Sequence, residues 1–356
     1  MRTRIFRPCA IVGLLAIFSL GGSPLSAQHP SPILPDAANI LSEQFATASV
    51  CSMCHSSATS AKALRDAKNR PIGPHDLWRS TMMAHSTADP LWRAVVAAEV
   101  AATPSRQKEI ETKCLRCHAP MASVEAELAK ITPSRERFLA GKSTLARLAS
   151  DGVSCTVCHQ LSPDELGADE TFSGHFQIGT QHQLFGPHAR PFGMPMFRHT
   201  GFTPTEGQHV RQSELCASCH TLFTHSLAAD GSTTGHTLLE QGPYIEWQNS
   251  QFNAKSSESN KHAATCQDCH VPTTDEDDNQ IKTRIARNPH GWDFPPVRPR
   301  SPFGRHIFVG GNTLVRSILR EQHSANGAEE IAAEFDRAIE ASRKLLRNQT
   351  ARIEIV

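Results

Sequence analysis

The pattern Cys-x-x-Cys-His occurs five times in this chain of 356 residues, and it restricts the fold more than any other feature. In chain order, the cysteine pairs of the five motifs are Cys51/Cys54, Cys114/Cys117, Cys155/Cys158, Cys216/Cys219 and Cys266/Cys269. The histidines that close the motifs are, in the same order, His55, His118, His159, His220 and His270. Every cysteine except Cys9 therefore belongs to one repeated motif.

This motif is the attachment pattern of a c-type haem. Two thiols separated by two residues can add to the two vinyl groups at one porphyrin edge. The next side chain can then turn under the ring, so that its imidazole reaches the iron. The sequence therefore predicts five haem c groups, with the ten paired cysteines as covalent attachment points and the five motif histidines as proximal iron ligands.

Other uses of paired cysteines fit this pattern less well. Disulfides and zinc sites are common in exported proteins, but neither requires a histidine directly after the second cysteine. Redox pairs of the thioredoxin type occur singly on a strand–helix unit. Five pairs out of five followed by histidine favour haem over all three alternatives.

The first 27 residues have the features of a signal peptide. Arg2, Arg4 and Arg7 precede an apolar run over residues 10–20, and small residues lead to a cleavage site near Ala27. The run is shorter than the roughly 20 residues that cross a bilayer, so no transmembrane span is expected. We expect a periplasmic or secreted protein. The 36 basic and 35 acidic side chains give no indication of a nucleic-acid partner.

Five porphyrins in a chain of this length must supply much of its apolar core. We expect a mainly α fold with much irregular structure and little β, in which residues 28–326 form one five-haem domain. The tail, residues 327–356, contains an amphipathic helix from Ala328 to Asn348, with Ile331, Phe335 and Ile339 at steps of four. Residues 351–356 alternate like a strand.

Residues 74–86 are expected to form a helix that begins at Pro74. On such a helix His75, Trp78, Met82 and His85 lie on one face. A second helix is expected from Asp89-Pro90 to about Ala102.

The buried stripe expected on the second helix consists of Leu91, Val95 and Ala98. Residues 171–214, rich in Gly, Pro and His, are expected to form a long loop region. The acidic run from Asp275 to Asp278 is expected to be a solvated loop rather than a calcium site.

The sixth ligand of each iron decides between an electron carrier and a catalyst. A second histidine closes the site, methionine raises the reduction potential, and an open position admits substrate. Of the 19 histidines, five belong to the motifs and 14 lie outside them. His29 lies beside the predicted cleavage site and is set aside.

Four histidines are the first candidates for distal ligands. His75 and His85 share the expected helical face, and Gly186-Pro187-His188 repeats the tripeptide that ends at His75. His306 lies in a strand-like segment, Arg305 to Val309, followed by two glycines that let backbone approach a ring. His199 is the next candidate. Weaker candidates are His182, His209, His225, His262 and His290, for which a propionate partner or a surface imidazole is the alternative. Met82 and Met83 are the methionine candidates, with core packing as the alternative.

Several longer strings resemble a family of exported bacterial multihaem cytochromes. They are GPHDLWRSTMMAHS from Gly73, CLRCHAP, DGVSCTVCHQ, LCASCHTLFT, PYIEW, CQDCHVP and RHIFVGGN, spread over most of the chain after the signal peptide. The family is related to the tetrahaem electron-transfer cytochromes that work beside hydroxylamine oxidoreductase. The resemblance implies mainly bis-histidine haems in close parallel and perpendicular pairs, with His75 and His306 as distal ligands. Longer members continue into a β-rich region, which would begin at the last residues of this chain.

Three functions follow from these features. The first is electron transfer between a periplasmic donor and acceptor protein, with no catalytic residue. The second is an oxidoreductase acting on a nitrogen oxide, hydroxylamine or a sulfur oxyanion at one open haem. The Cys-x-x-Cys-Lys motif of multihaem nitrite reductases is absent from the sequence, and Tyr244 is its only tyrosine. The third is a fixed subunit of a respiratory or extracellular electron conduit.

Overall fold

The computed structural model describes residues 39–228, 230–253 and 261–350. The chain divides into two units, Met1–Ser31 and Pro32–Val356. The predicted signal peptide and the strand predicted for residues 351–356 lie outside the described residues. Within the described residues, no helix is long and apolar enough to cross a membrane.

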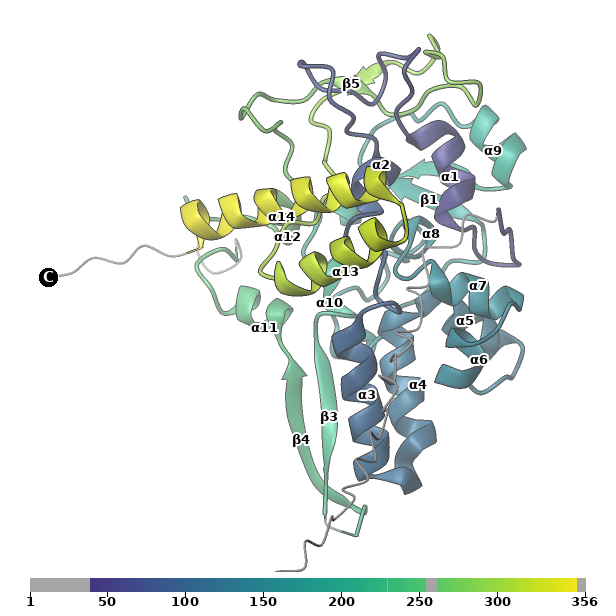
Figure 1. Cartoon of the computed structure of the whole chain (residues 1–356), viewed down its shortest axis with the longest axis vertical. Coiled ribbons are helices and arrows are strands. Elements are labelled where there is room, and N and C mark those ends of the chain that lie inside the picture. Colours follow the sequence, from purple (N-terminus) through teal and green to yellow (C-terminus); the bar gives the residue numbers. More distant parts are fainter. Residues whose placement is uncertain (1–38, 229, 254–260, 351–356) are drawn as a thin grey trace, which may run out of the picture. The chain divides into compact units, whose positions relative to one another are not determined.

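The described chain is mainly helical, with long irregular connections and a few short strands (Figure 1). The helices are α1 (Ala48–His55), α2 (Pro74–Trp78), α3 (Pro90–Ala102), α4 (Gln107–His118), α5 (Pro120–Leu128), α6 (Arg135–Leu139), α7 (Thr144–Ser150), α8 (Cys155–Cys158), α9 (Met194–Thr200), α10 (Glu214–Ala217), α11 (Pro243–Gln248), α12 (Cys266–His270), α13 (Leu314–Ala325) and α14 (Glu329–Gln349). This agrees with the mainly α class expected from the sequence.

The strands form two-stranded sheets. They are β1 (Gln183–Gly186) with β2 (Thr203–Glu206), β3 (Leu222–Leu227) with β4 (Thr233–Gln241), and β5 (Thr283–Arg284) with β6 (Pro299–Arg300). The first pair is parallel and the other two are antiparallel. The loop region predicted for residues 171–214 therefore contains a small sheet and helix α9, although most of it is irregular.

The helix predicted for residues 74–86 is wrong beyond its first turn. Helix α2 ends at Trp78, and turns follow. The hydroxyl of Ser80 donates to the Leu77 carbonyl, and Thr81 Oγ1 accepts from the Ala84 amide. Such side chains compete with the helical hydrogen bonds of the backbone. His75 and His85 therefore do not share a helical face.

Helix α3 begins where the sequence predicted, but it buries a different face. The Asp89 carboxylate caps it by accepting from the amides of Leu91 and Trp92, at 2.8 and 3.1 Å. Trp92 and Val96 are buried, whereas Leu91 is 60% and Val95 49% exposed. The predicted stripe of Leu91, Val95 and Ala98 is therefore wrong, because the cluster beneath α3 contacts the neighbouring face.

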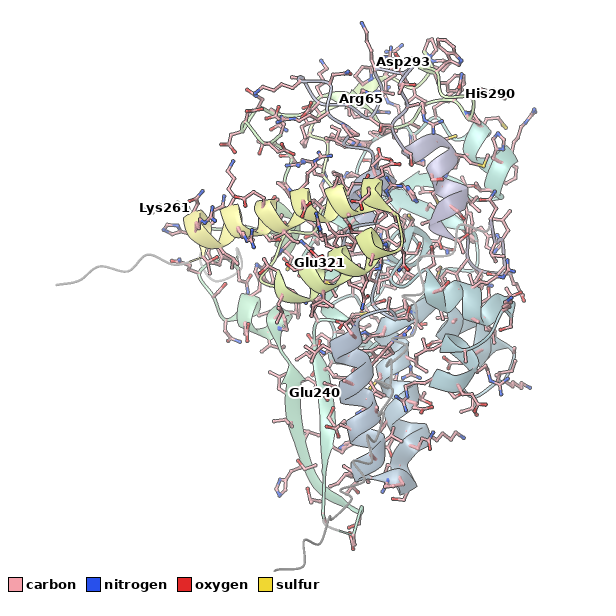
Figure 2. All side chains as sticks on the ribbon, viewed as in Figure 1. Arg65, Glu240, Lys261, His290, Asp293 and Glu321 are labelled. Carbon is pink, nitrogen blue, oxygen red and sulfur yellow. The ribbon has the colours of Figure 1, made fainter. Side chains whose placement is uncertain are left out.

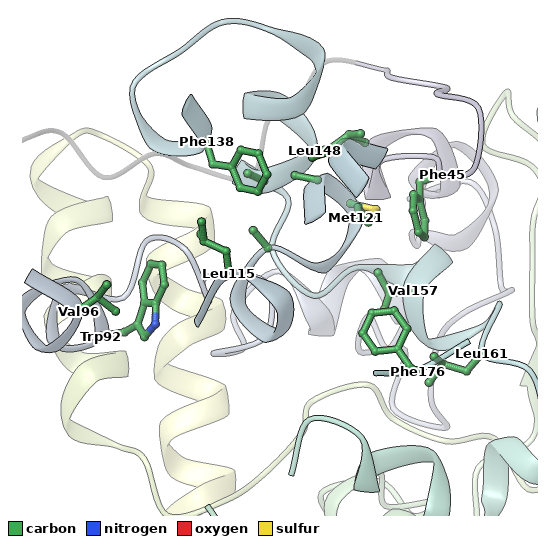
Figure 3. Packing of buried hydrophobic residues seen from close by; sticks show 14 residues of the cluster. Phe45, Trp92, Val96, Leu115, Met121, Phe138, Leu148, Val157, Leu161 and Phe176 are labelled. Carbon is green, nitrogen blue, oxygen red and sulfur yellow. The ribbon is translucent and has the colours of Figure 1, made fainter. Parts of the chain in front are cut away.

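The largest buried cluster is built mainly from helices α3 to α8, with Phe45, Leu161 and Phe176 added from segments outside them (Figure 3). It includes Trp92, Val96, Leu115, Met121, Phe138, Leu148 and Val157. Leu115 lies between the two cysteines of the second motif, and Val157 between those of the third. The core therefore anchors two motifs through the residues inside them.

The tail helix is confirmed by α14, which packs beside α13 (Figure 1). Phe335 is fully buried and Ile339 nearly so, as the predicted steps of four require. Helix α14 also contacts α2. The tail therefore belongs to the same unit as the motifs and is not a separate domain.

The acidic run from Asp275 to Asp278 forms a loop in which Asp275 is buried and the other three residues are exposed. Arg70 contacts Asp275, Glu276 and Asp277 at 3.5, 3.0 and 2.8 Å. Lys344 on α14 pairs with Asp278 at 3.2 Å. The predicted solvated loop is therefore confirmed for Glu276, Asp277 and Asp278, which are exposed, while basic side chains from distant segments pair with the carboxylates.

Candidate cofactor-binding site

All five motifs lie in or at the end of a helical turn. Helices α1, α4 and α12 end on the motif histidine, α8 spans the two cysteines of the third motif, and α10 contains Cys216. Residues three apart on a helix share a face, so the paired thiols point the same way. The ten motif cysteines are half-buried free thiols. This arrangement fits attachment of two thiols to one porphyrin edge.

Four of the five motif imidazoles are oriented by a backbone carbonyl. Their Nδ1 atoms donate to oxygens of residues that lie 26 to 230 positions away in the sequence. The pairs are His55 with Ile285 at 2.9 Å, His118 with Ser86 at 2.9 Å, His159 with Phe185 at 2.6 Å and His270 with Val309 at 2.5 Å. An imidazole held this way has its proton on Nδ1 and leaves the Nε2 lone pair for a metal.

His220 differs from the other four. Within the described residues, its ring has no such hydrogen bond. Its backbone is fixed, since its amide donates to Cys216 at 3.0 Å and its carbonyl accepts from Tyr244 at 3.2 Å. The fourth motif therefore has a defined main chain, while its imidazole has fewer constraints.

Two glycines let other segments approach motifs closely. Gly152 has a φ of +62°, and a Cβ there would lie 2.5 Å from the Met83 carbonyl oxygen. The adjoining Val153 amide donates to that oxygen at 2.9 Å. At Gly73 a Cβ would lie 2.8 Å from the carbonyl oxygen of His55. Only glycine fits these contacts, which hold the third motif and the entry to α2 in place.

Thiols of different motifs contact one another. A hydrogen bond to Cys155, together with burial, raises the pKa of Cys51. Equivalent bonds join Cys219 to Cys117 and Cys216 to Cys266. The charge of Cys158 also acts on Cys216 and Cys219. The first motif therefore adjoins the third, the third adjoins the fourth, and the fourth adjoins both the second and the fifth.

His306 faces the imidazole of the third motif. The ring centroids of His306 and His159 are 6.2 Å apart, with an angle of 27° between their planes. Two imidazoles on opposite sides of one metal, with bonds of about 2.1 Å, place their centroids about 6.4 Å apart. His306 Nδ1 donates to the Gly304 carbonyl at 3.1 Å, which leaves Nε2 for a ligand. His159 and His306 could therefore both hold one metal ion through Nε2.

The segment around His306 is not a strand, contrary to the sequence prediction. His306 and Ile307 form a turn, and no ladder pairs residues 305–309 among the described residues. Burial nevertheless alternates, with Arg305, Ile307 and Val309 inside. The alternating burial therefore comes from a segment that turns at His306 and Ile307 and has no partner strand among the described residues.

His75 lies beside the first motif. Its Nδ1 is 3.0 Å from the Ser56 hydroxyl, and burial lowers its pKa to about 4. Burial also lowers the pKa of His306 to about 4. Both imidazoles are therefore neutral at pH 7, the form that binds a metal.

His85 lies in a different environment, fully buried in the protein interior. Its Nε2 donates to the Arg79 carbonyl at 2.9 Å, and its ring lies 5.2 Å from that of His323. Within the described residues, His85 Nδ1 and both ring nitrogens of His323 are buried without a hydrogen-bond partner. His323 was missed by the sequence analysis because nothing in the sequence of α13 distinguishes it from other polar positions.

The remaining candidates are more scattered. His188 is half-buried after β1, where burial and the charges of Arg300 and Arg211 lower its pKa. His199 is exposed on α9. His182 contacts Phe202 at a centroid distance of 5.3 Å. The exposed members of the weaker group are His225, His262 and His290, the last labelled in Figure 2.

His209 is not a surface imidazole. It is 7% exposed, and its Nε2 lies 3.1 Å from the Leu161 carbonyl. Met82 packs against a cluster of Val315, Leu319 and Phe335, which agrees with core packing rather than ligation.

The second motif has an aromatic neighbour that the sequence analysis did not single out. The Trp92 ring stacks on His118 with centroids 4.4 Å apart and planes at 9°. Burial, and then the carboxylate of Glu240 on β4 (Figure 2), raise the pKa of Cys114 to about 11. Helix α3 and the β3–β4 hairpin therefore both border this motif.

The chain matches no family model, no curated protein and no solved structure. The motif residues nevertheless fit haem by their own chemistry: paired thiols on one face, and imidazoles with a free Nε2. The ten cysteines would hold five porphyrins, and the motif histidines would bind their irons. Haem bound there supplies one-electron redox chemistry.

Proposed function

We propose that this chain is an exported electron-transfer protein that carries five covalently bound c-type haems, mostly with two histidine ligands. The observation that carries the proposal is the orientation of four motif imidazoles by backbone carbonyls. Each imidazole has its Nε2 free, directly after a pair of thiols. Disulfides do not need this arrangement, and zinc sites do not need a histidine directly after the second cysteine.

The contacts between motif thiols support transfer among the haems. Porphyrins attached at thiols that interact with one another would themselves lie close together. These interactions predict that the haem of the third motif lies between those of the first and fourth motifs. The haems of the second and fifth motifs would both lie beside that of the fourth. In this role the protein fixes the positions of the haems and tunes their potentials. Electrons enter from one periplasmic protein and leave to another.

Histidines near two motif imidazoles favour a carrier over a catalyst. The His306 ring lies 6.2 Å from that of His159 at the third motif and would supply a second ligand there, and neutral His75 adjoins the first motif. A second imidazole on the iron blocks the position that a substrate would need.

The attachment of five haems can be tested by intact mass. The protein, produced with the cytochrome maturation system, should weigh five haems more than its processed polypeptide and show a Soret band. Replacing Cys266 and Cys269 with Ala should remove one haem and leave four. A mass equal to that of the bare polypeptide contradicts the proposal.

Electron paramagnetic resonance separates the carrier from an enzyme. We expect the oxidised protein to show only low-spin ferric iron at low temperature. A high-spin signal of about one haem in five that changes on adding nitrite or hydroxylamine would instead assign catalysis to an open site.

A further inference from the structure

Arg287 holds the last turn of α1, the helix that carries the first motif. Its amide donates to the Cys54 carbonyl at 3.0 Å. Its guanidinium donates to the carbonyls of Met53 at 2.7 Å and Ser56 at 2.6 Å, and more weakly to Ser52 at 3.5 Å. The last carbonyls of a helix lack partners within it, so one residue satisfies most of this end.

The same segment also orients the imidazole of this motif. Ile285, two residues before Arg287, accepts the hydrogen bond from His55 Nδ1 at 2.9 Å. Segment 285–287 therefore fixes both the helix and the histidine of the first motif, although it follows the fifth motif in the sequence.

Among the residues that the structure describes, no carboxylate forms an ion pair with Arg287. Within the described residues, all hydrogen-bond partners of its guanidinium are backbone carbonyls. Its field reaches the motif: burial raises the pKa of Cys54 while Arg287 opposes the rise, and burial and Arg287 both lower the pKa of His55. A full positive charge thus stands beside the first attachment site.

We propose that Arg287 is the positioning and potential-setting residue of the first haem: it locks the motif helix and raises the reduction potential of that haem. The inference rests on the proposed function. One electron converts ferric to ferrous haem and lowers the net charge of the haem by one. A nearby positive charge therefore stabilises the ferrous form relative to the ferric form.

The test is a spectroelectrochemical titration of the haem-loaded protein, with the electrode as electron source. Arg287→Gln should shift one of the five one-electron components to lower potential. Arg287→Lys keeps the positive charge but loses the planar guanidinium and most of its hydrogen bonds to α1. This variant should therefore return the component toward its original potential, while its melting temperature falls below that of the wild type. Arg320→Gln, which removes an arginine paired with Asp336 on α14, should move no component.

A second variant covers the case in which Arg287→Gln fails to hold the first haem. Met53 and Arg287 both line a cavity of about 380 Å³ beside the motif. Met53→Glu places a carboxylate near the guanidinium and keeps its hydrogen bonds, so it should also lower one potential.

The inference is overturned if all five reduction potentials of haem-loaded Arg287→Gln are unchanged. If Arg287→Gln loses the first haem, five unchanged potentials in Met53→Glu overturn it instead. A wild-type protein with fewer than five haems contradicts the proposed function itself, an outcome read from mass and not from potential.

Discussion

The imidazoles of His159 and His306 face each other with ring centroids 6.2 Å apart and planes at 27°. The two residues are far apart in sequence, yet each ring donates its Nδ1 proton to a carbonyl and presents Nε2. Face-to-face stacking would require a shorter separation. The spacing instead suits a metal between the rings.

Replacing His306 with Ala should therefore open one iron. We expect about one fifth of the ferric haem to become high-spin, because only the third site loses its second ligand. Optical and electron paramagnetic resonance spectra measure the change. His199→Ala, at an exposed position on α9, is the matched control for a histidine outside the pair. A fully low-spin His306→Ala protein would show that this imidazole binds no iron.

The stack of Trp92 on His118 predicts a contrast between neighbouring residues of α3. Trp92→Ala should destabilise the loaded protein by about 3 to 5 kcal/mol, as for other large buried aromatic residues. Leu91→Ala, at a residue that is 60% exposed, should change the unfolding free energy by less than about 0.5 kcal/mol. Denaturant unfolding followed by circular dichroism gives both values. Equal losses of unfolding free energy in the two variants would contradict burial of the α3 face that carries Trp92.

The pH dependence of the low-spin spectrum follows from the lowered pKa values. Burial lowers the pKa of His75 and of His306 to about 4, and only the neutral imidazole binds iron. Binding to iron would favour the neutral imidazole further. Protonation of these two histidines and loss of the ligand are therefore expected at or below pH 4. We expect the low-spin spectrum to persist from pH 7 to pH 5 in an optical titration. Loss of low-spin signal near pH 6.5, the value of an exposed imidazole, would place these histidines in solvent.

The motif residues can be named from the sequence alone, because covalent attachment of haem would fix their type and spacing. The sequence could not predict Ser86, Phe185, Ile285 and Val309 as partners of the motif imidazoles, since any residue supplies a carbonyl. These partners depend on how distant segments fold together.

The errors at helices have local causes. On α3, Leu91/Val95 and Trp92/Val96 both have helical spacing, and the Asp89 cap fixes where the helix begins but not which face is buried. After Trp78, the hydroxyls of Ser80 and Thr81 end the helix despite a suitable apolar pattern.

Arg79, at the end of α2, forms ion pairs with two carboxylates of α14. Its guanidinium donates to both carboxylate oxygens of Glu334, each at 2.6 Å, and to Glu330 at 2.8 Å. The Glu334 side chain is 13% exposed, so its loss leaves a largely buried cation short of a partner. Glu334→Gln should cost about 1 to 3 kcal/mol, less than a fully buried pair because water screens part of it.

Glu340→Gln on the same helix is the control, since Glu340 is 61% exposed and pairs with Arg347 at 3.3 Å. Its cost should stay below about 0.5 kcal/mol. Thermal unfolding of the loaded proteins compares the two variants. If Glu334→Gln lowers the melting temperature no more than Glu340→Gln, the ion pair does not hold α14 against the turn that follows His75.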